Sequence, residues 1–351
     1  MQELSIDSPS GGRSFSDLSR LYPTRTQPVQ VGPWTLGAEG FCVVAGPCSI
    51  ESKNQFTETA QHVRECGAAL LRGGVFKMRT CANSFQGLGD EALDIANEVS
   101  RTMGLPVVCE ITDPRQLDSF VEAVDMLQVG SRNMYNYSLL KELGRIKKPI
   151  LLKRGFSATV DEWLQAADYI VKGGNSQVVL CERGIRTFET KMRNTLDLAV
   201  VPYLKQNSPF PVIVDPSHAT GKPSLIGPMA LAAAAAGADG IMIEVHPHPE
   251  EALSDGFQAL TFAHFASLMV ELKSLLRALG RPLLCAPSAA ALATNFDRSP
   301  QAAGSATSGS ANPGSTHSVS AMQNVAPTVA TNLGASTTAM VDATSTTAEL
   351  S

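Results

Sequence analysis

The sequence predicts an α/β protein: a (β/α)8 TIM barrel with a short N-terminal hairpin and a disordered C-terminal tail. Short apolar, β-rich runs recur along the chain, and stretches with helical periodicity lie between them. Strands that alternate with helices pair in parallel, and eight such units in about 250 residues close into a barrel. The predicted strands are Phe41–Ala45, Ala69–Arg72, Val107–Ile111, Met126–Val129, Pro149–Lys153, Gln177–Cys181, Pro211–Asp215 and Gly240–His246.

The segments between the strands carry the start and stop signals of helices. In the stretch Ser52–Cys66, Ser52 can cap the start of a helix, and Gly67 ends it. Asp161–Lys172 has the same periodicity and runs into Gly173-Gly174, while the alanine run Ala232–Ala236 is a good helix former.

Two further features concern the start of the predicted barrel. Pro33–Gly40 precedes the first strand and is expected to form a small hairpin that closes the bottom of the barrel. An open doubly wound sheet is the main alternative fold. It normally carries a glycine-rich fingerprint after its first strand, and Ala45-Gly46-Pro47-Cys48 is not one.

Composition indicates a globular protein that binds neither nucleic acid nor membrane. Of 351 residues, 44% are hydrophobic and 17% charged, and the formal net charge of -5 argues against a nucleic-acid surface. No apolar run approaches the roughly 18 residues of a membrane span. Seven cysteines without a CxxC pair, and an N-terminus without an apolar signal region, favour the reducing cytoplasm.

Composition also divides the chain into three parts. Residues 1–29 are expected to be a flexible N-terminal segment and residues 30–285 the catalytic barrel. Residues 286–351 consist mostly of Ala, Ser, Thr, Gly, Asn and Pro, which bury too little apolar surface to offset the entropy of ordering. They are expected to form a low-complexity, disordered tail that contributes little to folding or catalysis.

Four potential metal ligands lie at or beyond the ends of predicted strands: Cys48, His218, Glu244 and Asp255. Each has an ordinary interpretation taken alone, because free cysteines are usually buried and single carboxylates are usually solvated. In a barrel, however, the carboxyl ends of the strands meet at one mouth. We therefore expect one mixed sulfur, nitrogen and oxygen site for a divalent ion, for which Mn, Fe, Co and Zn all remain open.

Basic residues gather at the same predicted mouth, which indicates an anionic substrate. Guanidinium groups match phosphate and carboxylate geometry, and a lysine supplies a point charge. There are more cations than one phosphate needs, so two phosphorylated groups, or a phosphate and a carboxylate, are expected. The residues are Arg72, Lys77, Arg79, Arg132 after Ser131, Lys153, Arg154, Arg183 and Arg186.

Several motifs, in order along residues 30 to 275, resemble the type I beta 3-deoxy-D-arabino-heptulosonate 7-phosphate synthases. They are Ala45-Gly46-Pro47-Cys48-Ser49-Ile50-Glu51, Lys77-Met78-Arg79-Thr80, Ser84-Phe85-Gln86-Gly87-Leu88-Gly89, Lys153-Arg154-Gly155 and Asp215-Pro216-Ser217-His218-Ala219-Thr220-Gly221. The resemblance implies a condensation of phosphoenolpyruvate with erythrose 4-phosphate, the first step of the shikimate pathway. It also implies a divalent metal ion and a homo-oligomer, dimer or tetramer.

The resemblance assigns a role to each candidate residue. It implies metal ligation by Cys48, His218, Glu244 and Asp255, with Lys77, Cys48 and His218 as the catalytic group. The substrate-binding residues that it implies are Arg132, Lys153 and Arg183 for the phosphate of phosphoenolpyruvate, Arg72 and Lys77 for its carboxylate, Arg79 and Thr80 for the aldose phosphate, and Ser131 and Asp215 beside them. Met78 and Cys81-Ala82 depart from the Pro and Ser-Pro that the family usually has.

Three alternatives stay open. A 3-deoxy-octulosonate 8-phosphate synthase takes arabinose 5-phosphate, but it typically has Lys-Ala-Asn-Arg-Ser and Asp-Ala-Thr-His where this chain has Lys77-Met78-Arg79-Thr80 and Asp215-Pro216-Ser217-His218. An aldolase could form a Schiff base at Lys153. A non-catalytic barrel would bind metal or phosphate without turnover. With no recognisable regulatory domain, we expect weak inhibition by tyrosine or phenylalanine.

Overall fold

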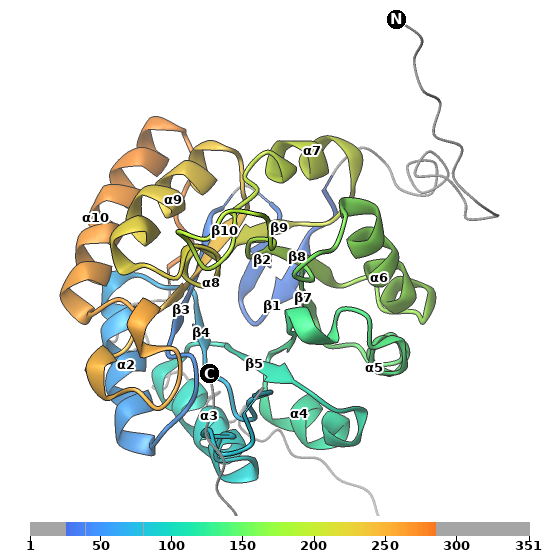
Figure 1. Cartoon of the computed structure of the whole chain (residues 1–351), viewed down its shortest axis with the longest axis horizontal. Helices are drawn as coiled ribbons and strands as arrows, with labels where there is room; N and C mark the ends of the chain where they lie inside the picture. Colours follow the sequence, from blue (N-terminus) through green and yellow to red (C-terminus); the bar gives the residue numbers. More distant parts are fainter. Residues whose placement is uncertain (1–25, 39, 80, 286–351) are drawn as a thin grey trace, which may run out of the picture. The chain divides into compact units, whose positions relative to one another are not determined.

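The computed structural model describes residues 26–38, 40–79 and 81–285, and these residues form a closed parallel barrel with helices around it (Figure 1). The strands pair in the order β10-β3-β4-β5-β6-β7-β8-β9. The predicted (β/α)8 fold is therefore confirmed. The predicted tail and almost all of the predicted flexible N-terminal segment lie outside the described residues. The strands are β3 (Cys42–Gly46), β4 (Leu70–Arg72), β5 (Val107–Ile111), β6 (Met126–Val129), β7 (Ile150–Lys153), β8 (Val178–Glu182), β9 (Val212–Val214) and β10 (Gly240–Glu244).

Local signals mark both ends of the first described helix, Lys53–Cys66. Ser52 accepts a hydrogen bond from the Gln55 amide at its start, and Gly67 ends it with a φ of 100°. In the described part of the chain, no helix is long and apolar enough to cross a membrane. The helices are α2 (Lys53–Cys66), α3 (Asp90–Met103), α4 (Leu117–Ala123), α5 (Tyr137–Leu143), α6 (Val160–Lys172), α7 (Val200–Asn207), α8 (Pro216–Thr220), α9 (Pro223–Ala235) and α10 (Phe262–Ala278).

Alternation along the strands separates two cores. Residues such as Val43 and Leu71 face the helices, while Val44 and Leu70 fill the inside of the barrel. Two residues beyond the inner apolar layer, the same inward register reaches polar side chains at the carboxyl ends of the strands. These residues are Arg72, Glu110, Gln128, Lys153, Arg183, Asp215 and Glu244. The period of two thus puts an apolar floor beneath a charged mouth.

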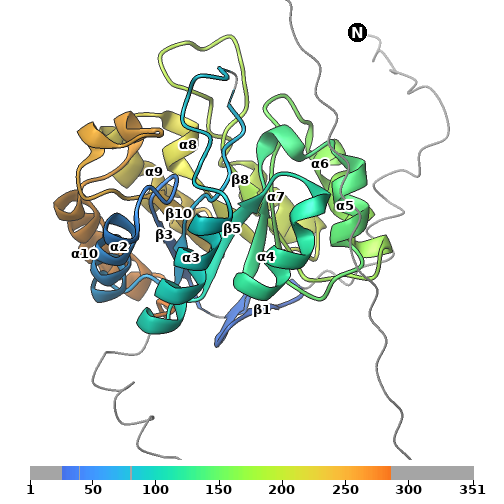
Figure 2. The ribbon, with the colours of Figure 1, turned by 90° about the horizontal axis from the view of Figure 1, so that it is seen from below.

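An antiparallel hairpin, β1 (Val29–Val31) and β2 (Trp34–Leu36), closes the other end of the barrel (Figure 2). Val29, Val31 and Leu36 pack against the inner apolar layer, and the Trp34 indole donates to the Ala69 carbonyl at 3.0 Å. The predicted N-terminal hairpin is confirmed, but its predicted range, Pro33–Gly40, was wrong because it contains only the second strand. Gly32-Pro33 forms its turn, with Gly32 at a φ of +54°, so both strands come earlier in the chain.

Candidate active site

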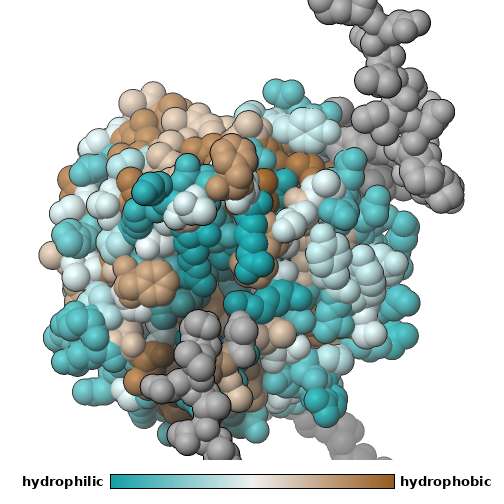
Figure 3. Space-filling view, viewed as in Figure 1, coloured by the Kyte–Doolittle hydropathy of each residue, from teal (hydrophilic) through white to brown (hydrophobic). Residues whose placement is uncertain are grey.

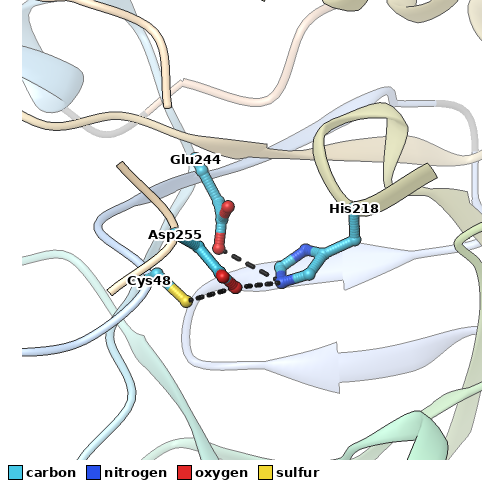
Figure 4. Close-up of side chains that lie close together, drawn as sticks. All are labelled: Cys48, His218, Glu244 and Asp255. Carbon is cyan, nitrogen blue, oxygen red and sulfur yellow. Dashed lines mark hydrogen bonds and ion pairs between the residues drawn. The ribbon is translucent and has the colours of Figure 1, made fainter. Parts of the chain in front are cut away.

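Four side chains from separate segments converge at the carboxyl end of the barrel (Figure 4). Cys48 follows β3, His218 lies in α8, Glu244 ends β10, and Asp255 lies in the loop after β10. Their potential ligand atoms all lie within 4.8 Å of one another. Asp255 Oδ2 is 3.4 Å from Cys48 Sγ and 3.8 Å from His218 Nε2, which is itself 3.2 Å from Glu244 Oε1.

Two unusual backbone conformations bring these side chains together. Gly46 has a φ of +150°, and a Cβ there would lie 2.2 Å from the Arg72 carbonyl oxygen, so only glycine lets β3 approach β4 this closely before Pro47 and Cys48. Asp255 has a φ of +52°, the one positive value of a non-glycine residue in the described ranges. Such a conformation is costly for most residues, and it turns the Asp255 carboxylate toward the cluster.

The donor set fits a divalent transition metal. A thiol, an imidazole and two carboxylates suit Mn, Fe, Co or Zn. Asp215 Oδ2 lies 2.8 Å from His218 Nδ1, which leaves Nε2 facing the cluster, the usual arrangement behind a metal-binding histidine. Glu244 Oε1 is buried and accepts no hydrogen bond, although the Arg72 guanidinium and His218 Nε2 each lie 3.2 Å from it, so this oxygen faces the group.

Burial and neighbouring charges shift the titration of these groups. Burial lowers the pKa of His218 despite Asp215 and Glu244, which favours the neutral imidazole that metals bind. Burial would raise the pKa of Glu244, but His218 and Arg72 outweigh it and lower that pKa. Burial, aided by Glu244, raises the pKa of Cys48 to about 12, so a cation is needed to hold its thiolate.

A cavity of about 300 Å³ opens above the cluster. Figure 3 shows hydrophilic side chains gathered over the middle of this face. Asp255, His218 and Glu110 line the cavity together with Ser131 and six cations. The cations are Lys77, Arg79, Arg132, Lys153, Arg183 and Arg193.

The predicted binding residues take up different depths in this site. Lys77 Nζ lies 2.8 Å from Cys48 Sγ, between the cluster and the cavity. Arg72 is buried and contacts Glu244 Oε1 at 3.2 Å. Asp215 is completely buried beneath the cavity and accepts from Lys153 Nζ at 2.6 Å, so its contacts are with other site residues. Thr80 lies outside the described residues.

Three of the side chains that line the cavity were not predicted from the sequence. Glu110 follows the inward register of β5 and could have been found from it. Phe156 makes cation–π contacts with three guanidinium groups, which lie 4.7 to 5.4 Å from its ring centre and belong to Arg132, Arg183 and Arg186. Arg193 lies in the irregular segment between β8 and α7, where no periodic pattern predicts which side chains face the cavity.

Arg154 does not face the mouth, contrary to the sequence-based expectation. It follows the inward Lys153, so alternation turns it toward the helices. There it lies 3.0 Å from both Glu182 and Asp197 and donates to the Ala158 carbonyl. Arg154 is therefore part of the buried framework behind the site.

Comparisons with known proteins agree with this geometry. The model of the DAHP synthetase I family matches residues 29–278. A phospho-2-dehydro-3-deoxyheptonate aldolase of Thermotoga maritima is 45% identical over 268 residues, 76% of this chain and 79% of that protein. A 2-dehydro-3-deoxyphosphooctonate aldolase of Magnetococcus marinus is 32% identical, over 66% of this chain and 86% of that protein.

Solved structures match the barrel as well. The crystal structure of the Thermotoga maritima DAHP synthase has a TM-score of 0.74 at 44% identity and covers 76% of this chain and 78% of that chain. A truncated form of the 3-deoxy-D-arabino-heptulosonate 7-phosphate synthase from the same organism has a TM-score of 0.71 at 42% identity, over 77% of this chain and 99% of that chain. The chain belongs to the DAHP synthetase I family, whose reaction is the condensation of phosphoenolpyruvate with erythrose 4-phosphate.

Proposed function

We propose that this chain is a metal-dependent enzyme that condenses phosphoenolpyruvate with erythrose 4-phosphate. The products are 3-deoxy-D-arabino-heptulosonate 7-phosphate and phosphate, in the first step of the shikimate pathway. One observation carries the proposal: a group of four potential metal ligands lies at the floor of a cavity lined by six cations. Two anionic substrates beside one Lewis acid need that combination.

The cations hold two anions in contact and offset their mutual repulsion. Arg132, Lys153 and Arg183 bind the phosphate of phosphoenolpyruvate in this proposal, and Arg72 and Lys77 lie by its carboxylate. Arg79, with Thr80, binds the phosphate of the aldose. This clamping turns a bimolecular encounter into an oriented one, which can lower a barrier by several kcal/mol.

Cys48, His218, Glu244 and Asp255 would hold the metal ion. When bound there, the ion supplies Lewis-acid polarisation of the aldehyde carbonyl or holds a water. Lys77 reaches from the cavity to Cys48 Sγ and is the residue placed to move a proton between the cluster and the substrates. Asp215 keeps the His218 ring and the Lys153 ammonium in place.

Chelation tests the metal requirement. The full chain is stripped with a chelator and assayed with and without Mn, Fe, Co and Zn, and Cys48→Ala is assayed beside it. We expect activity to vanish without metal and in Cys48→Ala. Cys109→Ala is the matched control, because Cys109 is equally buried but faces the helices from β5. Full activity of the metal-free protein would contradict the proposal.

The acceptor is tested by competition between sugars. The ratio of kcat/KM for erythrose 4-phosphate and arabinose 5-phosphate measures a difference in transition-state free energy. We expect kcat/KM to be clearly higher for erythrose 4-phosphate. Arg79→Ala should raise the KM for erythrose 4-phosphate far more than the KM for phosphoenolpyruvate. A preference for arabinose 5-phosphate would move the chain to the octulosonate branch, represented by the relatives near 30% identity.

The assembly and location of the enzyme complete the proposal. The net charge of -5 and the unpaired cysteines support an enzyme of the reducing cytoplasm that works without nucleic acid. A homo-oligomer, dimer or tetramer, is proposed from the family resemblance. Light scattering during size-exclusion chromatography of the full chain measures the mass, and a monomer at micromolar concentration would overturn the oligomer.

A further inference from the structure

We infer that Gln258 and Arg193 are positioning residues that select which carboxylate oxygens of Glu244 and Asp255 face the metal ion. The inference rests on the proposed metal-dependent function. Neither residue belongs to the four-ligand group, and neither was expected from the sequence. Both lie in irregular segments, Gln258 in the turn that follows Asp255 and Arg193 between β8 and α7.

Gln258 fixes Glu244 from behind. Its side chain is completely buried, and its amide nitrogen makes a short hydrogen bond to Glu244 Oε2. That contact occupies one oxygen of the carboxylate. The other, Oε1, is buried without a hydrogen bond and lies 3.2 Å from both His218 Nε2 and the Arg72 guanidinium. Glu244 is thereby presented to the cluster through a single oxygen.

The Gln258 amide donates and accepts at the same time, as both contacts at position 258 require. Its nitrogen donates to Glu244, and its oxygen accepts from Arg193 Nη1. An ionised carboxylate there would only accept and would repel Glu244. An apolar side chain would leave Glu244 and Arg193 without these partners inside the protein, and such groups are costly to leave unsatisfied.

Arg193 also contacts the second carboxylate, that of Asp255. Arg193 Nη1 lies 3.5 Å from Asp255 Oδ2, the oxygen that also faces Cys48 and His218. The guanidinium lies 5.7 Å from the centre of the Phe257 ring, and the Arg193 amide donates to the Thr220 carbonyl. One arginine thus holds Asp255 directly and Glu244 through Gln258.

Arg193 also lines the cavity, so it joins the metal site to the substrate side. Residues that orient metal ligands typically change metal affinity by roughly 10- to 100-fold when they are replaced. We therefore expect an effect on binding of the metal alone, before any substrate is added. A role limited to folding would instead change the melting temperature and leave the affinity of the folded protein unchanged.

In the test, the metal-free full chain is titrated with Co²⁺. Calorimetry and the absorption of the cobalt–thiolate contact measure the binding. Gln258→Met and Arg193→Met should each raise the Kd by roughly 10-fold or more. Arg281→Met is the matched control, because Arg281 also lies over a phenylalanine ring, Phe41, at the opposite end of the barrel. Arg193 lies at the cavity rather than in the core, so it keeps the test open if Gln258→Met does not fold.

The double variant Gln258→Met/Arg193→Met tests whether Arg193 acts on Glu244 through Gln258 or whether the two residues act independently. Because Arg193 acts partly through Gln258, the combined loss of affinity should be smaller than the product of the two single losses. Equal Kd values for wild type and both variants, or losses that multiply fully, would overturn the inference and leave the proposed function standing. A wild-type chain that binds no Co²⁺ would overturn both.

Discussion

Replacing Arg154 by methionine should destabilise the barrel severely, because the buried Glu182 carboxylate would lose the positive charge that pairs with it. The Arg154 side chain is 5% exposed and Glu182 is completely buried, at 3.0 Å. Removing one partner of such a pair costs about 3–5 kcal/mol. For a domain of this size each kcal/mol lowers the Tm by about 2–4 °C, so a drop of about 6–20 °C is expected.

The cost should depend on pH in a defined direction. Burial already raises the pKa of Glu182 in spite of Arg154, and losing the arginine raises it further. The folded variant then binds the Glu182 proton more tightly than the unfolded chain does, so its stability falls as pH rises from the unfolded pKa through the folded one. The deficit of Arg154→Met should therefore be smaller at pH 5 than at pH 8.

Urea unfolding of the metal-free protein measures these differences. The double variant Arg154→Met/Glu182→Gln removes both charges of this buried pair, while Asp197, the other partner of Arg154, is 30% exposed and can be solvated. The double variant should recover at least about half of the loss, since replacing both partners of a buried pair is often nearly neutral. Arg145→Met, which breaks an exposed pair with Glu142, is the control and should cost less than about 1 kcal/mol. A loss below about 1 kcal/mol in Arg154→Met, with no change upon adding Glu182→Gln, would refute the reasoning.

Three further predictions test the framework of the barrel. Gly46→Ala should cost about 3 kcal/mol or more, or prevent folding, because its Cβ would lie 2.2 Å from the Arg72 carbonyl oxygen; a near-native Tm would contradict this. Arg115→Met should raise the pKa of Asp113 from about 2 toward the ordinary aspartate value of 3.8, as followed by NMR. Since that pKa is depressed by Arg115, the contribution of Asp113 to stability is present above about pH 4 and is lost toward pH 2, and an unmoved pKa would disprove the pairing. Trp34→Phe removes the bond to the Ala69 carbonyl and should cost about 1 kcal/mol in urea unfolding, whereas an unchanged midpoint would show that the hairpin closes the barrel by apolar packing alone.

The positions of the strands could be predicted because their signal is local. A strand alternates with a period of two, so the register that buries Val44 and Leu70 inside the barrel also points Arg72 inward at the strand end. The same rule, applied strictly, would have turned Arg154 outward and brought Glu110 into the site. Neighbouring charges at a strand end, such as Lys153 and Arg154, therefore point to opposite faces and do not act as one group.

The irregular segments were decided by tertiary structure. Asp255 was expected among the metal ligands, but its positive φ and its approach to Cys48 depend on the fold of the loop after β10. Arg193 and Gln258 are 65 residues apart in the chain and meet only because β8, β9 and β10 lie side by side. No short-range pattern encodes such a contact, since loop residues follow no period and their partners are fixed by barrel closure. The sequence by itself therefore determined the barrel and the inward charges at its mouth, whereas the closed tertiary structure decided which loop side chains hold those charges in place.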